Sequence, residues 1–434
     1  MHAALSFEQA PPLTVPIRFF ATAPWFGVAA GLLLLWQGPE ALASRWSPAT
    51  MALTHLMTAG LMLQGMCGAL LQFVPVAVGG NVWRPRLVAA VLHPALALAA
   101  LLLPAAFLSA DRTLLCAAAA LFAVALGGFI AVVGLALLRT AATGASIATL
   151  RVALFGLLAT VPLGLAAAAT LGGALALPLA ATVNLHASWG LGGWALALLA
   201  AAAFSVVPMF QLTPNYPAWV KRAVPFGLLA ALAVLSLQAL IPGAPADPRP
   251  WQGLGLICAG GFAVATLRLQ QRRRRRVVDP TFGFFRGAMV SLLLASASGL
   301  TMLALPQLAG QPAAALWLGI LLIVGVFASA INGMIYKIVP FLYWLHLQRL
   351  GGPAAMLPNM RALISERSMR GQMALHFIAL ALLLAALALP ALARPGGAVL
   401  AASCAWLGGN VIGAYRVYAA FNSRIRASAA RRES

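Results

Sequence analysis

The chain has 434 residues, of which 62% are hydrophobic and 8% are charged, and its formal net charge is +21 at neutral pH. No soluble core needs that much apolar surface, so the composition excludes a soluble globular domain and indicates a membrane protein. Lipid offers no hydrogen bonds, so segments that cross it must be helices or a closed barrel. The apolar runs are continuous in Leu and Ala and do not alternate with polar residues, so we predict helices.

Twelve of these runs are long enough to cross a bilayer core of about 30 Å. In chain order we predict spans near residues 18–37, 50–75, 86–108, 113–138, 150–173, 178–209, 222–242, 252–269, 282–305, 313–343, 371–392 and 397–420. The prediction is one integral membrane domain over residues 1–434, with short tails at 1–17 and 421–434. The first residues, MHAALSFEQAPP, contain no basic region, so we expect no cleaved signal peptide.

The basic residues are distributed unevenly between the predicted loops. If the N-terminus lies inside, the inner side holds 24 of the 28 basic residues, and the outer side keeps Arg45, Arg112, Arg249 and Arg394. Because basic loops favour the cytoplasmic side, we predict that both termini lie in the cytoplasm.

The same asymmetry accounts for the high net charge. The run QRRRRR at 271–276 is interpreted as a topology anchor beside anionic lipid, so no nucleic-acid partner is expected. The bias toward Arg over Lys, together with the many Ala and Leu residues, is typical of a GC-rich bacterium. We therefore expect a multi-pass protein of a bacterial inner membrane, with the lipid bilayer as its surroundings.

The second, sixth and tenth predicted spans share a signature near their ends. They contain LLQFVPV, AFSVVPM and IYKIVPF, whose prolines are 133 and 132 residues apart, at Pro75, Pro208 and Pro340. Each proline follows a valine and has a glycine fifteen residues upstream, at Gly60, Gly193 and Gly325. This period predicts three pseudo-symmetric four-helix arcs, and repeats of this kind place ligand sites between the units.

Two of the repeated spans also carry a histidine followed by a glycine-rich stretch, in THLMTAGLMLQGMCGALLQFVPV and in NLHASWGLGGWALALLAAAAFSVVPMF. Together with twelve spans in three arcs, these motifs make the chain resemble subunit I of the heme-copper oxidase superfamily. The two motifs look like the helices with a histidine and glycines in the non-oxidase relatives, which include the NnrS-like heme- and copper-containing membrane proteins. By the number and spacing of its helices, the chain resembles this superfamily over most of its length. The specific motifs cover about three helices. The resemblance implies heme b, with copper as a second cofactor.

The resemblance implies that His55 corresponds to the second-span histidine that binds the low-spin heme in oxidases. It likewise implies that His186 corresponds to the sixth-span histidine on copper. The seventh span, KRAVPFGLLAALAVLSLQAL, lacks the paired histidines that complete that copper site. The tenth span lacks both heme histidines, and Ile320 stands at the position equivalent to His55. The complete catalytic centre is therefore absent, and we expect no oxygen reductase activity.

Further candidate ligands follow from residue type and spacing. His55, Ala59, Met62 and Met66 share one face of the second span at helical spacing. A histidine with two thioethers can bind heme iron or Cu(I), whereas the alternative is that the methionines fill irregular packing. His186 lies 22 residues before its proline and His55 lies 20 before its own, so the two share a face only if one helix contains a bulge or the alignment of the prolines slips.

Three other polar residues lie within the predicted spans. His93 and His376, in the inner halves of the third and eleventh spans, either belong to a second site or simply bond a carbonyl, and we favour the bond. Lys337 lies three residues before Pro340, where the other units have Gln72 and Ser205. These polar positions either bond carbonyls freed by a helix-ending proline or line an inner vestibule. Three roles stay open for Lys337. Its ammonium group can extend toward water at the membrane surface, pair with a heme propionate, or belong to a proton path from the cytoplasm.

Three classes of function stay open. The first is a heme-binding protein, with copper as a further ligand, that serves electron transfer, heme or copper handling, or a nitric-oxide response. The second is a cofactor-free or Cu(I) transporter on the same scaffold, although all seven acidic residues fall in predicted tails or loops, unlike those of most proton-coupled transporters. The third is a structural or assembly partner of a respiratory complex, which would co-purify with respiratory or cytochrome subunits.

Overall fold

A computed structural model of the chain describes residues 9–240, 247–274, 279–351 and 358–433. Within these ranges every regular element is a helix and no strand occurs, which confirms the all-α prediction. Twelve helical segments of the described chain are long and apolar enough to cross a membrane, as predicted. The chain is therefore a multi-pass membrane protein.

The helices in chain order are α1 (Thr14–Gln37), η2 (Gly38–Leu42), α2 (Pro48–His55), η3 (Leu56–Met62), α3 (Leu63–Val78), α4 (Pro85–Ser109), α5 (Arg112–Arg139), α6 (Ala145–Leu171), α7 (Leu179–Ser188), η4 (Trp189–Leu196), α8 (Ala197–Gln211), α9 (Ala218–Leu240), α10 (Arg249–Gln271), α11 (Pro280–Ala304), α12 (Pro306–Ala309), α13 (Pro312–Ile320), η5 (Leu321–Ala328), α14 (Ser329–Gly351), α15 (Met360–Leu363), α16 (Glu366–Ala386), η6 (Pro390–Leu392) and α17 (Ala393–Glu433). Where helices join end to end, as in α2–η3–α3, they form a single span.

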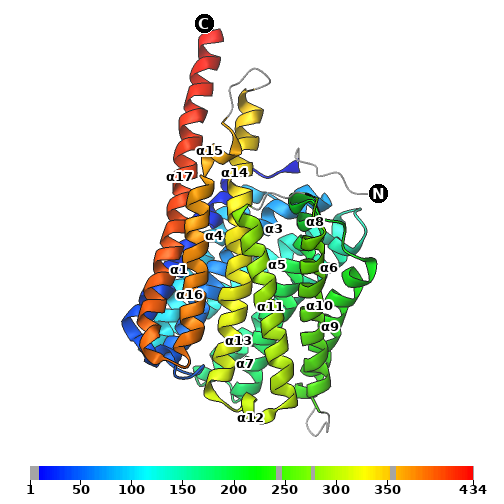
Figure 1. Cartoon of the computed structure of the whole chain (residues 1–434), viewed down its shortest axis with the longest axis vertical. Coiled ribbons are helices and arrows are strands. Elements are labelled where there is room, and N and C mark those ends of the chain that lie inside the picture. The colour runs from blue at the N-terminus through cyan, green and yellow to red at the C-terminus, as the bar shows by residue number, and fades with distance from the viewer. Residues whose placement is uncertain (1–8, 241–246, 275–278, 352–357, 434) are drawn as a thin grey trace.

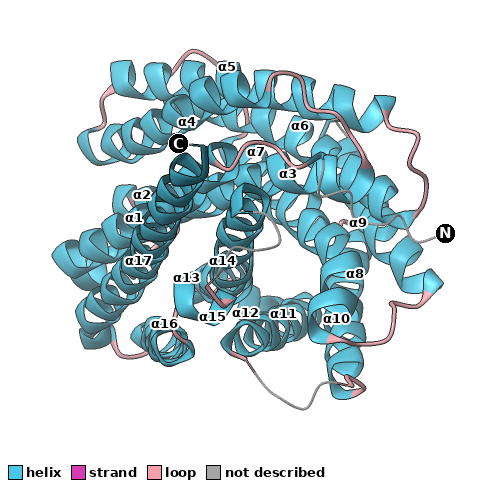
Figure 2. Ribbon diagram, turned by 90° about the horizontal axis from the view of Figure 1, so that it is seen from above, coloured by secondary structure: helices cyan, strands magenta, loops and turns pink. Residues whose placement is uncertain are grey.

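The three spans with the repeated signature form the centre of the bundle. Their most apolar stretches are 78%, 67% and 67% buried, in Pro48–Val78, Leu179–Gln211 and Pro312–Leu350. The corresponding values for the other described spans lie between 28% and 56%, because one side of each of those helices faces outward. Seen from above, α14 lies near the middle of the bundle, whereas α5 and α16 lie at its edge (Figure 2).

Each central span changes helix type in its middle. The segments η3, η4 and η5 are π-helical, so their turns are wider than those of the α-helices on either side. Each π-helical segment contains the repeated glycine of its unit, Gly60, Gly193 or Gly325. The repeat in the sequence therefore coincides with a repeated departure from α-helical geometry.

The repeated glycines lie where a neighbouring helix comes close. In the second unit a Cβ on Gly156 of α6 would fall on the backbone carbonyl of Gly193, so neither helix has room for a side chain there. The first and third units show close approaches at the same place, at Gly60 and Phe26 and at Gly325 and Ser291. In each case the partner comes from the span just before, which is α1, α6 or α11.

Contacts between helices follow the predicted period as well. The fourth span of one predicted unit packs on the first span of the next, as α5 on α6 and α10 on α11. The last span, α17, packs on α1 and closes the ring. The division into three pseudo-symmetric arcs itself stays a prediction.

The repeated prolines do not end their helices, so this part of the prediction was wrong. Pro75 and Pro208 lie inside helices that continue for three more residues, and α14 runs on from Pro340 to Gly351. A membrane helix tolerates an internal proline where neighbouring helices or side chains satisfy the freed backbone groups.

The predicted tails also differ from the structure. The first span already begins at Thr14, and residues 1–8 lie outside the described part of the chain. At the other end, α17 continues as one helix of 41 residues to Glu433. Ala and Arg are frequent after residue 420, and both are good helix formers, so nothing stops the helix where the apolar run ends.

The start of α1 and the end of α17 lie at the same end of the bundle, as an even number of spans requires (Figure 1). We call this end the terminal face and the opposite end the distal face. The connection between η2 and α2, residues 43–47, belongs to the distal face because α1 has crossed the bundle before it. That the terminal face is cytoplasmic stays a prediction.

Candidate cofactor site

A cavity of about 680 Å³ opens among the central spans in the distal half of the bundle. Residues of all three π-helical spans line it, together with residues of α4, α5 and α6. The wall is mostly apolar and carries a few polar groups, among them Thr54, Thr58, Thr160 and Ser188. The volume and this mixed lining are typical of sites that hold a small molecule or a cofactor.

His55 and His186 both line this cavity, and their imidazole rings face each other across it. The ring centroids are 6.4 Å apart and the ring planes differ by 18°. The sequence predicted each histidine separately as a candidate ligand. The structure brings the two together, and in each span a π-helical segment begins close after the histidine, at Leu56 and at Trp189.

A backbone carbonyl orients each of the two imidazole rings. The Nδ1 atom of His55 lies 2.8 Å from the carbonyl oxygen of Met51, and that of His186 lies 3.0 Å from the carbonyl oxygen of Thr160. Since a carbonyl oxygen only accepts, each Nδ1 must carry the proton and donate. In the neutral ring the Nε2 lone pair is then available to a metal, which is how ligating histidines are commonly held.

The two histidines are close enough to belong to one site. Their ring centroids are 6.4 Å apart and their ring planes are nearly parallel. Imidazole is a ligand that suits both heme iron and copper, so these are the residues that would hold either one.

Small residues make room for the His186 ring. A Cβ on Gly164 of α6 would lie 2.8 Å from Cε1 and 3.0 Å from Nδ1 of His186, so only glycine fits at this position. On the other side of the cavity the ring of Phe107 packs against His55, with their centroids 5.3 Å apart. The two imidazoles are therefore held by packing as well as by hydrogen bonds.

The predicted methionines line the same cavity. Met62 and Met66 are 3% and 7% exposed, and Ala59 lines the wall beside them, so the face predicted from helical spacing is present despite the π-helical segment. Sequence reasoning missed Met57, which also lines the cavity and is 4% exposed. A π-helical turn holds more residues than an α-helical one, so a face worked out from α-helical spacing omits such a position.

Arg45 lies at the distal mouth of the cavity and was predicted only as an outer-loop charge. Its Nη2 donates to Oδ1 of Asn184 at 2.8 Å, and its guanidinium lies 4.4 Å from the ring centroid of Trp46. Partial burial lowers the pKa of Arg45, although an arginine remains charged at neutral pH. Among the lining residues it is the one permanent cation and can face an anionic group of a ligand.

The other predicted histidines lie outside the cavity. Nε2 of His93 is 2.8 Å from Oγ1 of Thr22, which itself bonds the carbonyl of Arg18, so His93 joins α4 to α1. His376 is buried between Ser329 and Asn332 of α14. Each of these histidines also bonds a backbone carbonyl, that of Arg18 for His93 and that of Val324 for His376, as the sequence suggested.

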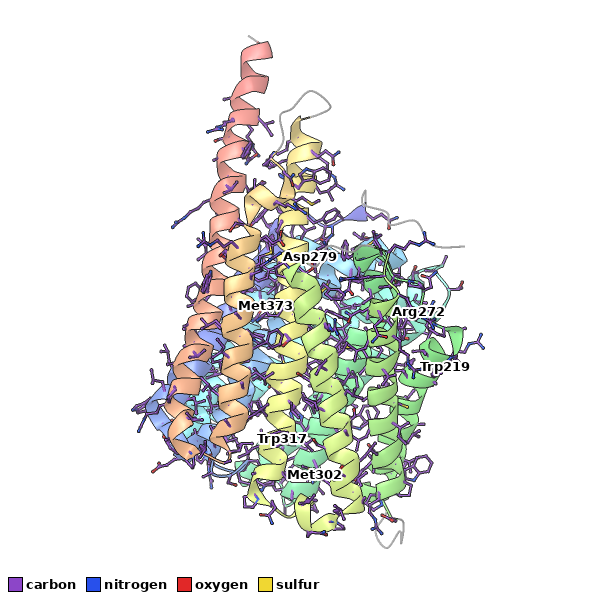
Figure 3. The ribbon with its side chains drawn as sticks, in the orientation of Figure 1. Trp219, Arg272, Asp279, Met302, Trp317 and Met373 are labelled. Atoms are coloured by element: carbon purple, nitrogen blue, oxygen red, sulfur yellow. The ribbon has the colours of Figure 1, made fainter. Side chains whose placement is uncertain are left out.

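Lys337 does not face the cavity either. Its Nζ lies 3.5 Å from Oδ2 of Asp279, which caps the start of α11 near the terminal face (Figure 3), and 5.3 Å from the ring centroid of Phe210. Ser205, at the equivalent position, faces Ser146 with 3.4 Å between the hydroxyl oxygens. Residues 146 and 279 are 133 apart and Ser205 and Lys337 are 132 apart, so a polar pair recurs in the third unit within one residue of the same register.

Within the described ranges, no three His, Cys, Asp or Glu side chains gather in a way that would hold a metal ion. A metal in the cavity would therefore depend on the two histidines and on softer or exogenous ligands. The chain matches no family model and no curated protein. The functional interpretation accordingly rests on the geometry of the cavity.

Proposed function

We propose that the protein binds heme b in the cavity between His55 and His186, and that it serves electron transfer, heme or copper handling, or a nitric-oxide response without reducing oxygen. The observation that carries the proposal is the pair of facing imidazoles, 6.4 Å apart, each with Nδ1 fixed by a carbonyl. We further propose that the protein is a non-oxidase relative of the heme-copper oxidases in a bacterial inner membrane.

The residues of the cavity fit a heme in three respects. Nε2 of each histidine is available to iron, the cavity of about 680 Å³ is mostly apolar, and Arg45 at its mouth can face a propionate. Heme would supply one-electron chemistry, while the protein would hold the iron ligands and exclude water. The predicted pairing of a propionate with Lys337 is not part of this proposal, because that lysine lies beside Asp279 near the terminal face.

Copper is the second candidate, and the methionines favour it. Met57, Met62 and Met66 line the same cavity as the two histidines, and thioethers with imidazoles are a ligand set that selects Cu(I). In this version the protein would carry or conduct copper and need no heme. The third class, an assembly partner without a cofactor, has no particular residue arrangement in its favour.

A pyridine hemochrome assay combined with metal analysis of the purified protein tests the proposal. We expect about one heme b per chain in protein from heme-replete cells, and loss of its visible spectrum in His55→Ala and in His186→Ala. His93→Ala is the matched control, because this histidine lies outside the cavity, and it should keep the spectrum.

A colourless, heme-free wild-type preparation would overturn the heme proposal. Copper without heme, lost when Met62 and Met66 are both changed to Leu, would support the copper version instead. If that double variant accumulated copper as the wild type does, the copper version would also fail.

A further inference from the structure

A second hollow lies at the terminal face, between the beginnings of α6 and α9. It is an open groove of about 460 Å³, and it is separate from the cofactor cavity because the two share no lining residue. Its lining includes Ala145, Ala148, Tyr216, Lys221, Arg222 and Phe226. Two of the lining residues are cations and none is an anion, so the groove favours a negatively charged ligand.

The two cations of the groove, Lys221 and Arg222, have no acidic partner among the described residues. The carboxylates of the terminal face whose side chains the structure describes, those of Asp279 and Glu366, pair with other cations. On the opposite wall, no side chain caps the start of α6 at Gly144. Both walls of the groove therefore present positive charge that no described side chain neutralises.

The groove becomes apolar with depth. Both helices begin at the terminal face, so Ala148 lies one turn deeper than Ala145, and Phe226 lies one turn deeper than Arg222. Phe226 is 50% exposed, and Trp219, at the outer edge of the bundle in Figure 3, is 66% exposed. The two are seven residues apart on one face of α9, so this face meets the lipid, with the tryptophan near the membrane surface.

Tyr216 gives the groove a fixed wall. Its side chain is 3% exposed, and its hydroxyl oxygen lies 2.9 Å from Oγ1 of Thr266. Its ring packs against Phe204 of α8 and Phe262 of α10, with ring centroids 5.1 and 6.1 Å away. Packing against two further helices therefore holds this side of the groove in place.

We propose that the groove binds an anionic phospholipid, with its phosphate beside Lys221 and Arg222 and its acyl chains along Ala148 and Phe226. Basic pockets between transmembrane helices are suited to such head groups. A free phosphate ion would use only the charged end of the groove, whereas a lipid uses the charged end and the apolar end together. The proposal goes beyond the proposed function, since it holds whatever the cavity contains.

Native mass spectrometry of the purified full-length protein in detergent tests the binding, because it counts the lipids bound to each chain. The probes are phosphatidylglycerol and phosphatidylcholine with the same acyl chains, of which only the first carries a net negative charge. We expect a single phosphatidylglycerol to bind about tenfold more tightly than phosphatidylcholine, the size expected for two basic side chains beside one anionic head group. Equal affinities for the two lipids would overturn the proposal.

A charge variant connects the preference to the groove. Lys221→Gln combined with Arg222→Gln should abolish the preference for phosphatidylglycerol. The matched control is Arg361→Gln combined with Arg367→Gln, which removes two exposed cations from the same face outside the groove and should keep the preference. Loss of the preference in both variants would mean that the lipid responds only to the net charge of this face, and would overturn the proposed site.

A second variant tests the shape of the groove while both cations stay in place. Ala145→Trp fills the groove and should abolish the preference as the charge variant does. Ala141→Trp places the same side chain at an exposed position outside the groove and should keep it. A filled variant that elutes as the wild type does yet keeps the preference would overturn the site.

Soluble glycerol phosphate distinguishes a lipid from a free phosphate compound. It carries the charged group without acyl chains, so about a hundredfold excess over the lipid should leave phosphatidylglycerol bound, because chain burial adds affinity that the soluble compound lacks. Displacement at that excess would show that the groove takes free phosphate compounds, and would overturn the lipid proposal. Because heme content is measured separately, none of these results bears on the proposed cofactor.

Discussion

At the scale of single residues, the candidate site depends on two imidazoles that line one cavity and lie close together. The sequence predicted His55 and His186 from a resemblance, and it predicted Met62 and Met66 from helical spacing. It did not predict that the histidines meet, because their separation depends on how two spans pack. The carbonyls of Met51 and Thr160 that orient them carry no signal in the sequence, since every residue has a carbonyl.

Gly164→Ala should disturb the site without removing a ligand. The added Cβ would lie 2.8 Å from Cε1 of His186, so the ring must turn away from the cavity. We expect the heme or copper content per chain to fall about tenfold or more, as it does when partners that orient metal ligands are lost. Gly128→Ala on α5, where a Cβ meets no atom within 4 Å, should keep the wild-type content. Full cofactor content in Gly164→Ala would contradict the proposed ligand.

The pair formed by Lys337 and Asp279 should contribute modestly to stability. Each side chain is 27% exposed, so solvent screens the attraction, and we expect a coupling free energy of about 0.5–1 kcal/mol. A double-mutant cycle with Lys337→Met and Asp279→Asn measures it from thermal unfolding in detergent, and the asparagine keeps a capping side chain on α11. The coupling should shrink at 1 M salt. A coupling that is zero at low salt would mean that the lysine only snorkels.

At the scale of elements, the three π-helical segments are the main feature that the sequence did not reveal. The repeated Gly60, Gly193 and Gly325 were visible, but a glycine in an apolar run predicts close packing or flexibility and does not predict a change of helical pitch. The period of 132–133 residues was the better signal. Applied to Ser146, this period reaches positions 278 and 279, and so would have pointed to Asp279 as the partner of Lys337.

Gly156→Ala should destabilise the second unit. Its Cβ would fall on the carbonyl of Gly193 in η4, and backbone cannot move aside as a flexible side chain does. We expect a loss of about 1–3 kcal/mol, typical of overpacking, seen as a lower midpoint of thermal unfolding. Gly261→Ala on α10 has open space around the new methyl group and should be neutral or slightly stabilising, because alanine favours helix. Equal midpoints for the two variants would show that α6 and η4 can separate without cost.

At the scale of the whole molecule, the number and type of spans were predicted well, because lipid leaves few alternatives for long apolar runs. The ends of the helices were predicted less well. α14 and α17 run past the apolar stretches at the terminal face, where Tyr343 stacks on Tyr418 with ring centroids 4.7 Å apart. Packing between two long helices therefore extends the fold beyond the limits that hydrophobicity sets.

The predicted orientation can be tested with single added cysteines in a variant whose exposed Cys116 and half-buried Cys258 are changed to Ser, which leaves only the buried Cys67 and Cys404. Ser423→Cys on α17 should react with a membrane-impermeant maleimide only after the cells are permeabilised. Ala43→Cys in the distal connection should react in intact cells. Both positions are exposed, so access to the reagent alone should decide the result. The opposite pattern would place the terminal face outside the cytoplasm.

The contact between α17 and α1 joins the last span of the chain to the first. Backbone meets backbone there, since a Cβ on Gly31 would lie 2.6 Å from the carbonyl oxygen of Gly397. Of the junctions between the predicted units, this is the one that no peptide connection crosses. The point at which translation starts is therefore arbitrary with respect to the finished molecule: a gene that began at the second unit and finished with the first would specify the same set of neighbours.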